Sequence, residues 1–319
     1  MEEQSSNDTP DEQERASKSA PGDPLEHLFV KQGSVRAGWR LLIYAVIFLA
    51  LWISFSYVLV QIFHPRRGVF SPGFQLAGES ASFFSALGAA WVMALIEERS
   101  LGSYGLPGRS AFGKLFWQGC LFGLVEIGAL VGIIAALHGY SFGSLAEHGA
   151  GILRWGLFWA GFFVVVGFFE EFFFRGYSLH TLAEGVGFWP AAVILALCFG
   201  AVHWPNVGEN WIGVVGVVLV GLFWSFTLKR TGSLWFAVGM HAAFDFGETF
   251  LLSVPDSGMV FPGHLSNAAL HGPSWLTGGA PGPEASFIDF AILLLFFVIF
   301  DRWYPARKTT GAAVMRSAA

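Results

Sequence analysis

The chain has 319 residues, a formal net charge of -5, 54% hydrophobic residues and 13% charged residues, with 34 Phe and 13 Trp. Soluble domains carry about 25% charged residues, so this composition argues against a soluble globular protein and favours one that spans a membrane. The basic residues are few and scattered, which excludes a nucleic-acid-binding patch.

The chain begins with a polar segment, MEEQSSNDTPDEQERASKSAPGDP, that is almost free of apolar residues. Such a segment cannot bury enough apolar surface to offset the entropy lost on ordering, so we predict a disordered cytoplasmic tail over residues 1–36. It lacks the basic start and apolar core of a signal peptide. The remainder divides into a transmembrane domain over residues 37–304 and a second cytoplasmic tail over residues 305–319.

Continuous apolar runs follow the tail, separated by clusters of Gly, Pro and polar residues. A spanning helix needs about 20 mostly apolar residues, and only helices or closed barrels satisfy the backbone hydrogen bonds in lipid. Because the runs do not alternate in polarity, the sequence predicts an all-α, polytopic bundle of about eight membrane helices. The expected spans are 38–63, 77–97, 113–137, 153–180, 188–204, 211–229, 232–253 and 285–304.

Most Lys and Arg residues fall on cytoplasmic flanks of these spans if the N-terminus lies in the cytoplasm. Arg66, Arg67 and Arg154 are the exceptions. The Gly- and Pro-rich loop 253–285 contains neither Lys nor Arg, as expected of a solvated external linker. The sequence therefore predicts an integral protein of the cell (plasma) membrane with both termini in the cytoplasm.

The third span carries small residues at four-residue spacing, Gly119 with Gly123 and Gly128 with Gly132. In a membrane this spacing lets helix backbones approach closely, so we expect helix packing at both pairs. Glu126 in the same span is a lone acid, which must be neutral or face a polar interior.

The fourth span contains two acids and a base within FFEEFFFRGY. Each charge near the bilayer centre costs about 2.5–3.5 kcal/mol. Glu171 and Arg175 are four residues apart and share a helix face, so the guanidinium can neutralise that carboxylate. Glu170 is rotated by about 100° and needs a different partner.

Candidate partners lie on two later spans. The fifth contains His203 in FGAVH, and the seventh contains His241 and Asp245 on one helical face in HAAFD. Either histidine alone would fit as a packed core residue, and the acids and Arg could form a structural ion-pair network. Ionisable groups on three membrane segments more often mark a reactive or conducting site.

The three motifs, in order, resemble a known family. They are E-E-x-x-x-R at 170–175, F-x-x-x-H at 199–203 and H-x-x-x-N/D at 241–245. This set resembles the CPBP family of intramembrane proteases, also called the CAAX protease, bacteriocin-processing or abortive-infection family, which includes the type II CAAX prenyl endopeptidases. The resemblance covers the core 150–253. It implies an endopeptidase that acts on membrane-embedded, membrane-associated or lipid-modified peptide and protein substrates.

The resemblance also implies roles for the motif residues. Glu170 with His203 would activate the attacking water, and Glu171 with Arg175 would brace the helix. A glutamate among phenylalanines suits this role, because peptide hydrolysis needs a base near the working pH.

His241 and Asp245 would stabilise the oxyanion. An ionised aspartate only accepts hydrogen bonds, so Asp245 is either protonated or orients His241. Proteins of this family are described both as metalloproteases and as glutamate-dependent hydrolases that use no metal. We favour no metal cofactor; the alternative is zinc held by Glu170, His203 and His241, a ligand set with an open fourth position.

Two other classes of function also fit buried acids and histidines. A proton-coupled membrane transporter would commonly show inverted repeats, and we find none. A catalytically idle immunity or scaffold membrane protein would have lost a motif residue, and none is lost. The intramembrane endopeptidase is therefore the favoured function.

Overall fold

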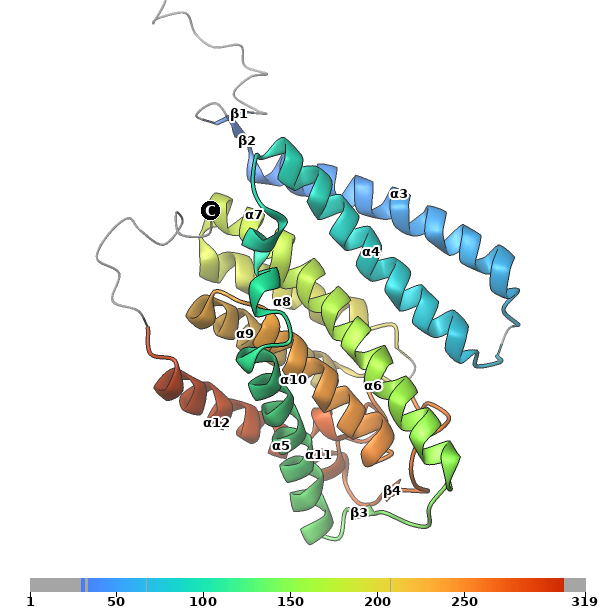
Figure 1. Ribbon diagram of the computed structural model, residues 1–319. Coiled ribbons are helices and arrows are strands. Elements are labelled where there is room, and N and C mark those ends of the chain that lie inside the picture. Colours follow the sequence, from blue (N-terminus) through green and yellow to red (C-terminus); the bar gives the residue numbers. More distant parts are fainter. Residues whose placement is uncertain (1–29, 32–33, 67, 207, 307–319) are drawn as a thin grey trace, which may run out of the picture.

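The computed structural model describes residues 30–31, 34–66, 68–206 and 208–306 and shows a bundle of helices with two short strand pairs (Figure 1). The predicted tails, 1–36 and 305–319, lie largely outside the described residues. Every predicted apolar run forms a helix, so the all-α class is confirmed.

The helices are α3 (Ala37–Phe63), α4 (Pro72–Ile96), α5 (Lys114–Ala136), α6 (Ala150–Glu171), α7 (Ser178–Val186), α8 (Phe188–His203), α9 (Trp211–Thr231), α10 (Trp235–Phe246), α11 (Ser274–Thr277) and α12 (Phe287–Trp303). The strands are β1 (Val30–Lys31), paired antiparallel with β2 (Ser34–Val35), and β3 (Tyr140–Ser141), paired antiparallel with β4 (Ala269–Leu270). Capping residues set both ends of α9. Asn210 caps the start of α9 through its side-chain oxygen, and Gly232 ends α9 in the left-handed conformation.

Five helices of the described chain are long and apolar enough to cross a membrane: α3, α4, α5, α9 and the continuous helix 150–186 that joins α6 to α7. The protein is therefore an integral membrane protein by composition and length. The helices α8, α10 and α12 have 16, 12 and 17 residues and fall short of that length. The predicted count of about eight spans is thus confirmed for five helices and untested for the other three.

Helix α10 packs between α5 and α6, whereas α3 and α4 lie side by side at one edge of the bundle (Figure 1). Glycines permit the close approach of α5 to α10. A Cβ added to Gly119 would overlap the Phe236 carbonyl oxygen, and one added to Gly123 would overlap that of Met240. The first predicted glycine pair therefore packs against α10 as expected.

The second glycine pair does not pack in this way. A Cβ added to Gly128 or Gly132 would meet nothing within 4 Å, so the predicted close helix contact there is wrong. Both residues lie on the exposed face of α5, whereas Ile127 and Val131 of the same stretch are buried. Spacing alone does not decide which helix face is covered.

The loop between α10 and α12 is not the solvated linker that its composition suggested. It folds back onto the bundle, with Ser266 and Thr277 buried. Strand β4 ties it to β3, and a further bridge joins Leu145 to Ser266. The loop therefore forms part of the bundle interior rather than extending into solvent.

Candidate active site

Glu170 and Glu171 occupy the last turn of α6, near the middle of the continuous helix 150–186. A π-helical turn, Phe172–Tyr177, follows directly, and Gly176 inside it has non-helical dihedral angles. Such π-helical turns are rare and occur frequently at functional sites. The turn interrupts the regular α-helix directly after the two acids, which is a further sign of a functional site at this position.

Glu171 forms an entirely buried hydrogen-bonded group. Its Oε1 accepts hydrogen bonds from Nη1 of Arg175 at 3.1 Å and from Nδ1 of His241 at 3.1 Å. The guanidinium of Arg175 also lies 4.1 Å from the ring centroid of Phe199. A Cβ added to Gly221 would overlap Nη2 of Arg175, so this glycine makes room for the buried cation. The predicted pairing of Glu171 with Arg175 is therefore present.

Glu170 is rotated by about 100° from Glu171 on the helix and makes no hydrogen bond to Arg175. Its Oε2 has no hydrogen-bond partner among the described residues and lies 4.0 Å from Nε2 of His203 and 3.7 Å from Nε2 of His241. Both separations exceed a direct hydrogen bond and leave the carboxylate oxygen open toward the two imidazoles. The acid without a local partner is thus the one that faces both histidines.

His203 ends α8 and is held in one orientation. Its Nδ1 lies 2.8 Å from the Phe199 carbonyl oxygen, which can only accept, so Nδ1 donates and carries the hydrogen. The ring also packs edge-on against Phe199. In the neutral ring Nε2 is then an acceptor, and it faces Glu170. The α8 helix thus brings His203 to within 4.0 Å of Glu170.

His241 is buried on α10 and stacks on Trp224, with ring centroids 4.4 Å apart and an interplanar angle of 17°. Its Nδ1 faces Glu171, and its Nε2 lies 3.3 Å from Oδ2 of Asp245. Carboxylates therefore flank the ring at both nitrogens. The structure thus brings all six predicted site residues into one connected group.

A cavity of about 470 Å³ opens at this group. Its walls include Glu170, His203, His241 and Asp245 together with apolar side chains such as Phe162 and Val220. Polar and apolar side chains share the wall of this cavity, and the convergence of polar groups among apolar ones is typical of a ligand site.

The donors proposed for zinc can be compared with zinc geometry. Bonds of about 2.0–2.2 Å hold tetrahedral zinc ligands about 3.2–3.6 Å apart. Glu170 lies 4.0 Å and 3.7 Å from the two imidazole Nε2 atoms. Among the described residues, the potential ligand atoms that lie within 4.8 Å of one another belong to Glu248, Asp256 and Glu284, and not to Glu170 and the two histidines. The two histidines and Glu170 therefore do not fit a zinc ion as they stand.

Sequence reasoning missed further acids in the cavity wall. The same cavity is lined by four acids that the sequence analysis did not name: Glu79, Asp256, Glu284 and Asp289. Glu126 lines it too, which agrees with the expectation that this acid is neutral or faces a polar interior. Each stands alone in an apolar or loop segment, so no spacing pattern identifies it. The available signal was the acid itself, within or beside a membrane span.

The fold and the site together define a helical membrane protein with a glutamate, two histidines and a buried guanidinium around an internal cavity. Residues 152–247, from α6 to the end of α10, match the family described as type II CAAX prenyl endopeptidase Rce1-like. The resemblance seen in the three motifs is thereby confirmed for this segment of the chain. No curated protein and no solved structure shows significant similarity to the chain.

Proposed function

We propose that this protein is an intramembrane endopeptidase that hydrolyses a peptide bond of a membrane-associated or lipid-modified substrate. The observation that carries the proposal is the open Oε2 of Glu170, which faces the Nε2 atoms of His203 and His241 inside the cavity. The family match supports a peptide hydrolase, because its printed description is that of an endopeptidase.

Glu170 and His203 serve as the pair that activates water. Water in the space between them donates one hydrogen bond to Oε2 of Glu170 and one to Nε2 of His203. Glu170 takes the proton as the water oxygen attacks the substrate carbonyl carbon. The same proton then passes to the amide nitrogen as the C–N bond breaks, which regenerates the carboxylate and releases a carboxylic acid and an amine.

His241 serves as the donor to the developing oxyanion. Its Nδ1 is held by Glu171, and its Nε2 lies between Asp245 and Glu170. A ring that donates at both nitrogens must carry two hydrogens, and the flanking carboxylates favour that charged form. This geometry favours the orienting role for Asp245 over direct donation to the oxyanion.

The proposed topology follows the distribution of basic residues, with both termini in the cytoplasm and the site between the midplane and the cytoplasmic face. The buried pairing of Arg175 with Glu171 braces α6 where the chain turns into the π-helical segment. The substrate enters from the bilayer into the apolar part of the cavity.

The test uses the purified full-length chain in detergent with two fluorogenic peptides, identical except that one carries a farnesylated cysteine four residues from its C-terminus. We expect cleavage by the wild-type chain and a loss of at least about 100-fold in Glu170→Gln, because the base is removed. Glu147→Gln, the same chemical change in the loop before α6, should cleave at the wild-type rate. Preference between the two peptides reports the substrate class.

Cleavage at the wild-type rate in Glu170→Gln would show that another group is the base. If the wild-type chain cleaves neither peptide and yields no new termini in a membrane proteome, the peptidase proposal fails, and proton-coupled solute flux in vesicles would then support a transporter. Stoichiometric zinc in the purified chain, with activity lost to a chelator and restored by zinc, would overturn the metal-free mechanism.

A further inference from the structure

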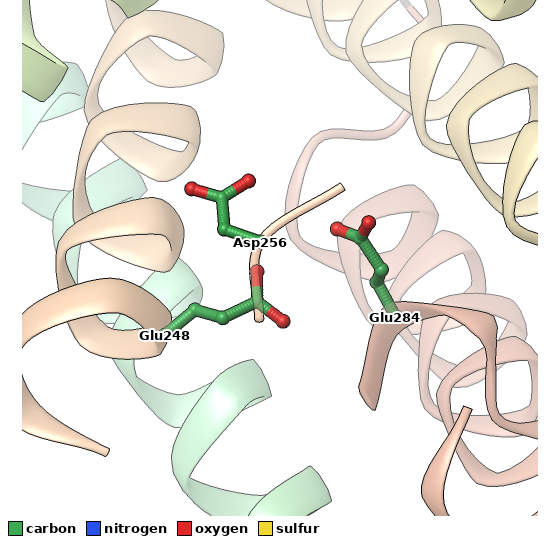
Figure 2. Close-up of side chains that lie close together, drawn as sticks. All are labelled: Glu248, Asp256 and Glu284. Atoms are coloured by element: carbon green, nitrogen blue, oxygen red, sulfur yellow. The ribbon is translucent and has the colours of Figure 1, made fainter. Parts of the chain in front are cut away.

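A second group of acids lies just beyond the family-matched segment. Glu248 is in the π-helical turn Gly247–Leu251 after α10, while Asp256 and Glu284 come from the loop that folds onto the bundle. One ligand oxygen from each of the three lies within 4.8 Å of the others. Figure 2 shows the carboxyl group of Glu248 projecting toward the space between Asp256 and Glu284.

Glu248 is fully buried, and neither of its carboxylate oxygens has a hydrogen-bond partner among the described residues. Each of the other two acids engages one oxygen only. Oδ2 of Asp256 accepts from Oγ1 of Thr249 at 3.0 Å, and Oε1 of Glu284 accepts from the Ser257 amide at 2.8 Å. Both therefore keep a second oxygen able to bind a ligand.

No Lys or Arg forms an ion pair with these three acids in the described part of the chain, and the loop 253–285 contains neither residue. Unpaired buried carboxylates are costly, so a cation at their centre would relieve both desolvation and mutual repulsion.

We propose that Glu248, Asp256 and Glu284 bind one calcium ion. Carboxylate oxygens are the donors that hard divalent cations prefer. Calcium takes about six to eight oxygen ligands in flexible geometry and readily accepts several carboxylates, whereas magnesium demands near-ideal octahedral geometry, keeps several waters and is usually bound through few carboxylates. Three carboxylates that converge on one space therefore suit calcium better than magnesium, and the remaining coordination positions would be filled by water.

The ion would join the end of α10 to two points of the long loop. Asp256 and Glu284 line the same cavity as Glu170, so calcium would fix that part of the cavity wall. The backbone is built for this approach: Gly282 has φ +128°, and a Cβ there would overlap the Pro255 carbonyl oxygen. Calcium binding is independent of the proposed peptidase chemistry, since none of the three acids belongs to the Glu170 group.

The experiment is isothermal titration of CaCl₂, and separately of MgCl₂, into the full-length chain in detergent after removal of metals with a chelator. We expect saturable binding of one calcium ion per chain and an increase of about 5 °C in Tm at saturating calcium. Magnesium should bind at least about tenfold more weakly, because it demands near-ideal octahedral geometry and gives up its waters reluctantly. Glu248→Gln and Glu284→Gln should each lose the calcium-dependent shift.

Two controls keep the test independent of folding and of catalysis. Glu79→Gln removes another acid of the same cavity outside the proposed site and should keep the shift. Glu170→Gln should bind calcium like the wild-type chain even though it is expected not to cleave peptide. In the absence of calcium, Glu248→Gln should unfold at or above the wild-type Tm, because it removes an unpaired carboxylate.

Absence of calcium binding would overturn the proposal, as would equal binding of magnesium or an undiminished calcium shift in both Glu248→Gln and Glu284→Gln. A calcium-free Glu248→Gln variant that unfolds well below the wild-type Tm would also count against the site. That result would mean that the Glu248 carboxylate makes a stabilising interaction in the absence of a cation. Loss of peptide cleavage alone leaves the calcium result unaffected, since binding is measured without substrate.

Discussion

Two groups of buried carboxylates lie in this molecule, and they differ in what surrounds them. In the first, Glu171 shares one oxygen between Arg175 and His241, and Glu170 and Asp245 face imidazole nitrogens. In the second, Glu248, Asp256 and Glu284 face one another, with no Lys or Arg paired to them among the described residues. The first group is charge-compensated by the protein, and the second is not.

The difference separates two ways to keep acids inside a membrane protein. A compensated group persists without a ligand and can leave one carboxylate, here Glu170, open for chemistry. An uncompensated group needs protons or a cation. The family match ends at residue 247, so it covers the first group and stops just before the second. Likeness to the family therefore supports a peptidase and carries no information about a cation.

The largest expected effect tests whether Glu170 and His203 act as one unit. We expect Glu170→Gln and His203→Ala each to lower kcat/KM by about 10²–10⁴, and the double variant to be no worse than the poorer single variant. If both residues activate the same water, removing either one disables the same catalytic step, and removing the second costs little more. A double variant in which the two losses multiply would show that Glu170 and His203 act independently. The measurement is peptide cleavage, with thermal unfolding as the check on folding.

The second expected effect concerns the compensation itself. Arg175→Met leaves the buried Glu171 carboxylate without a cation and should lower the free energy of unfolding by about 3–5 kcal/mol. Adding Glu171→Gln to that variant should recover part of the loss, because the unpaired charge is then gone. Chemical unfolding in detergent measures both. An Arg175→Met chain as stable as wild type would mean that the first group, like the second, is not held by charge pairing.

The contrast between the groups also explains what the sequence could predict. The helices follow from long apolar runs, and the pairing of Glu171 with Arg175 follows from four-residue spacing on one helix. The meeting of Glu170 with His203 and His241 came from the order of the three motifs. The relative depths of the three side chains do not follow from the sequence, because tilt and helix packing are set by neighbouring helices.

The second group was not predictable in the same way. Glu248, Asp256 and Glu284 share no periodicity, since the last two lie in a loop whose path depends on Gly282 and on the pairing of β3 with β4. The composition of that loop is typical of a solvated linker, and the prediction was wrong because strand pairing and buried side chains hold it against the helices.

A third prediction tests how α10 is positioned. Gly123→Ala would place a methyl group against the Met240 carbonyl oxygen, one residue before His241, and push α10 away from α5. A shift of this kind misplaces the imidazole, so we expect kcat/KM to fall by about 100-fold with a modest loss of Tm. Gly128→Ala on the same helix meets open space and should leave activity unchanged. Equal activity of the two variants would show that the close contact does not position His241.

The smallest expected effect concerns Asp245, the residue that connects the two groups. Its Oδ2 lies 3.3 Å from Nε2 of His241, while its charge also opposes ionisation of Asp256 and Glu284. Asp245→Asn keeps an oxygen that accepts from His241 but exchanges a charged acceptor for a neutral one. Such an exchange weakens a hydrogen bond by about 1–1.5 kcal/mol, so we expect a fall of about tenfold in kcat/KM. Unchanged activity would instead support a protonated Asp245 that donates to the oxyanion, because asparagine supplies that donor outright. Calcium affinity, measured on the same variant, should fall only slightly, since Asp245 contributes charge and no ligand oxygen to the second group.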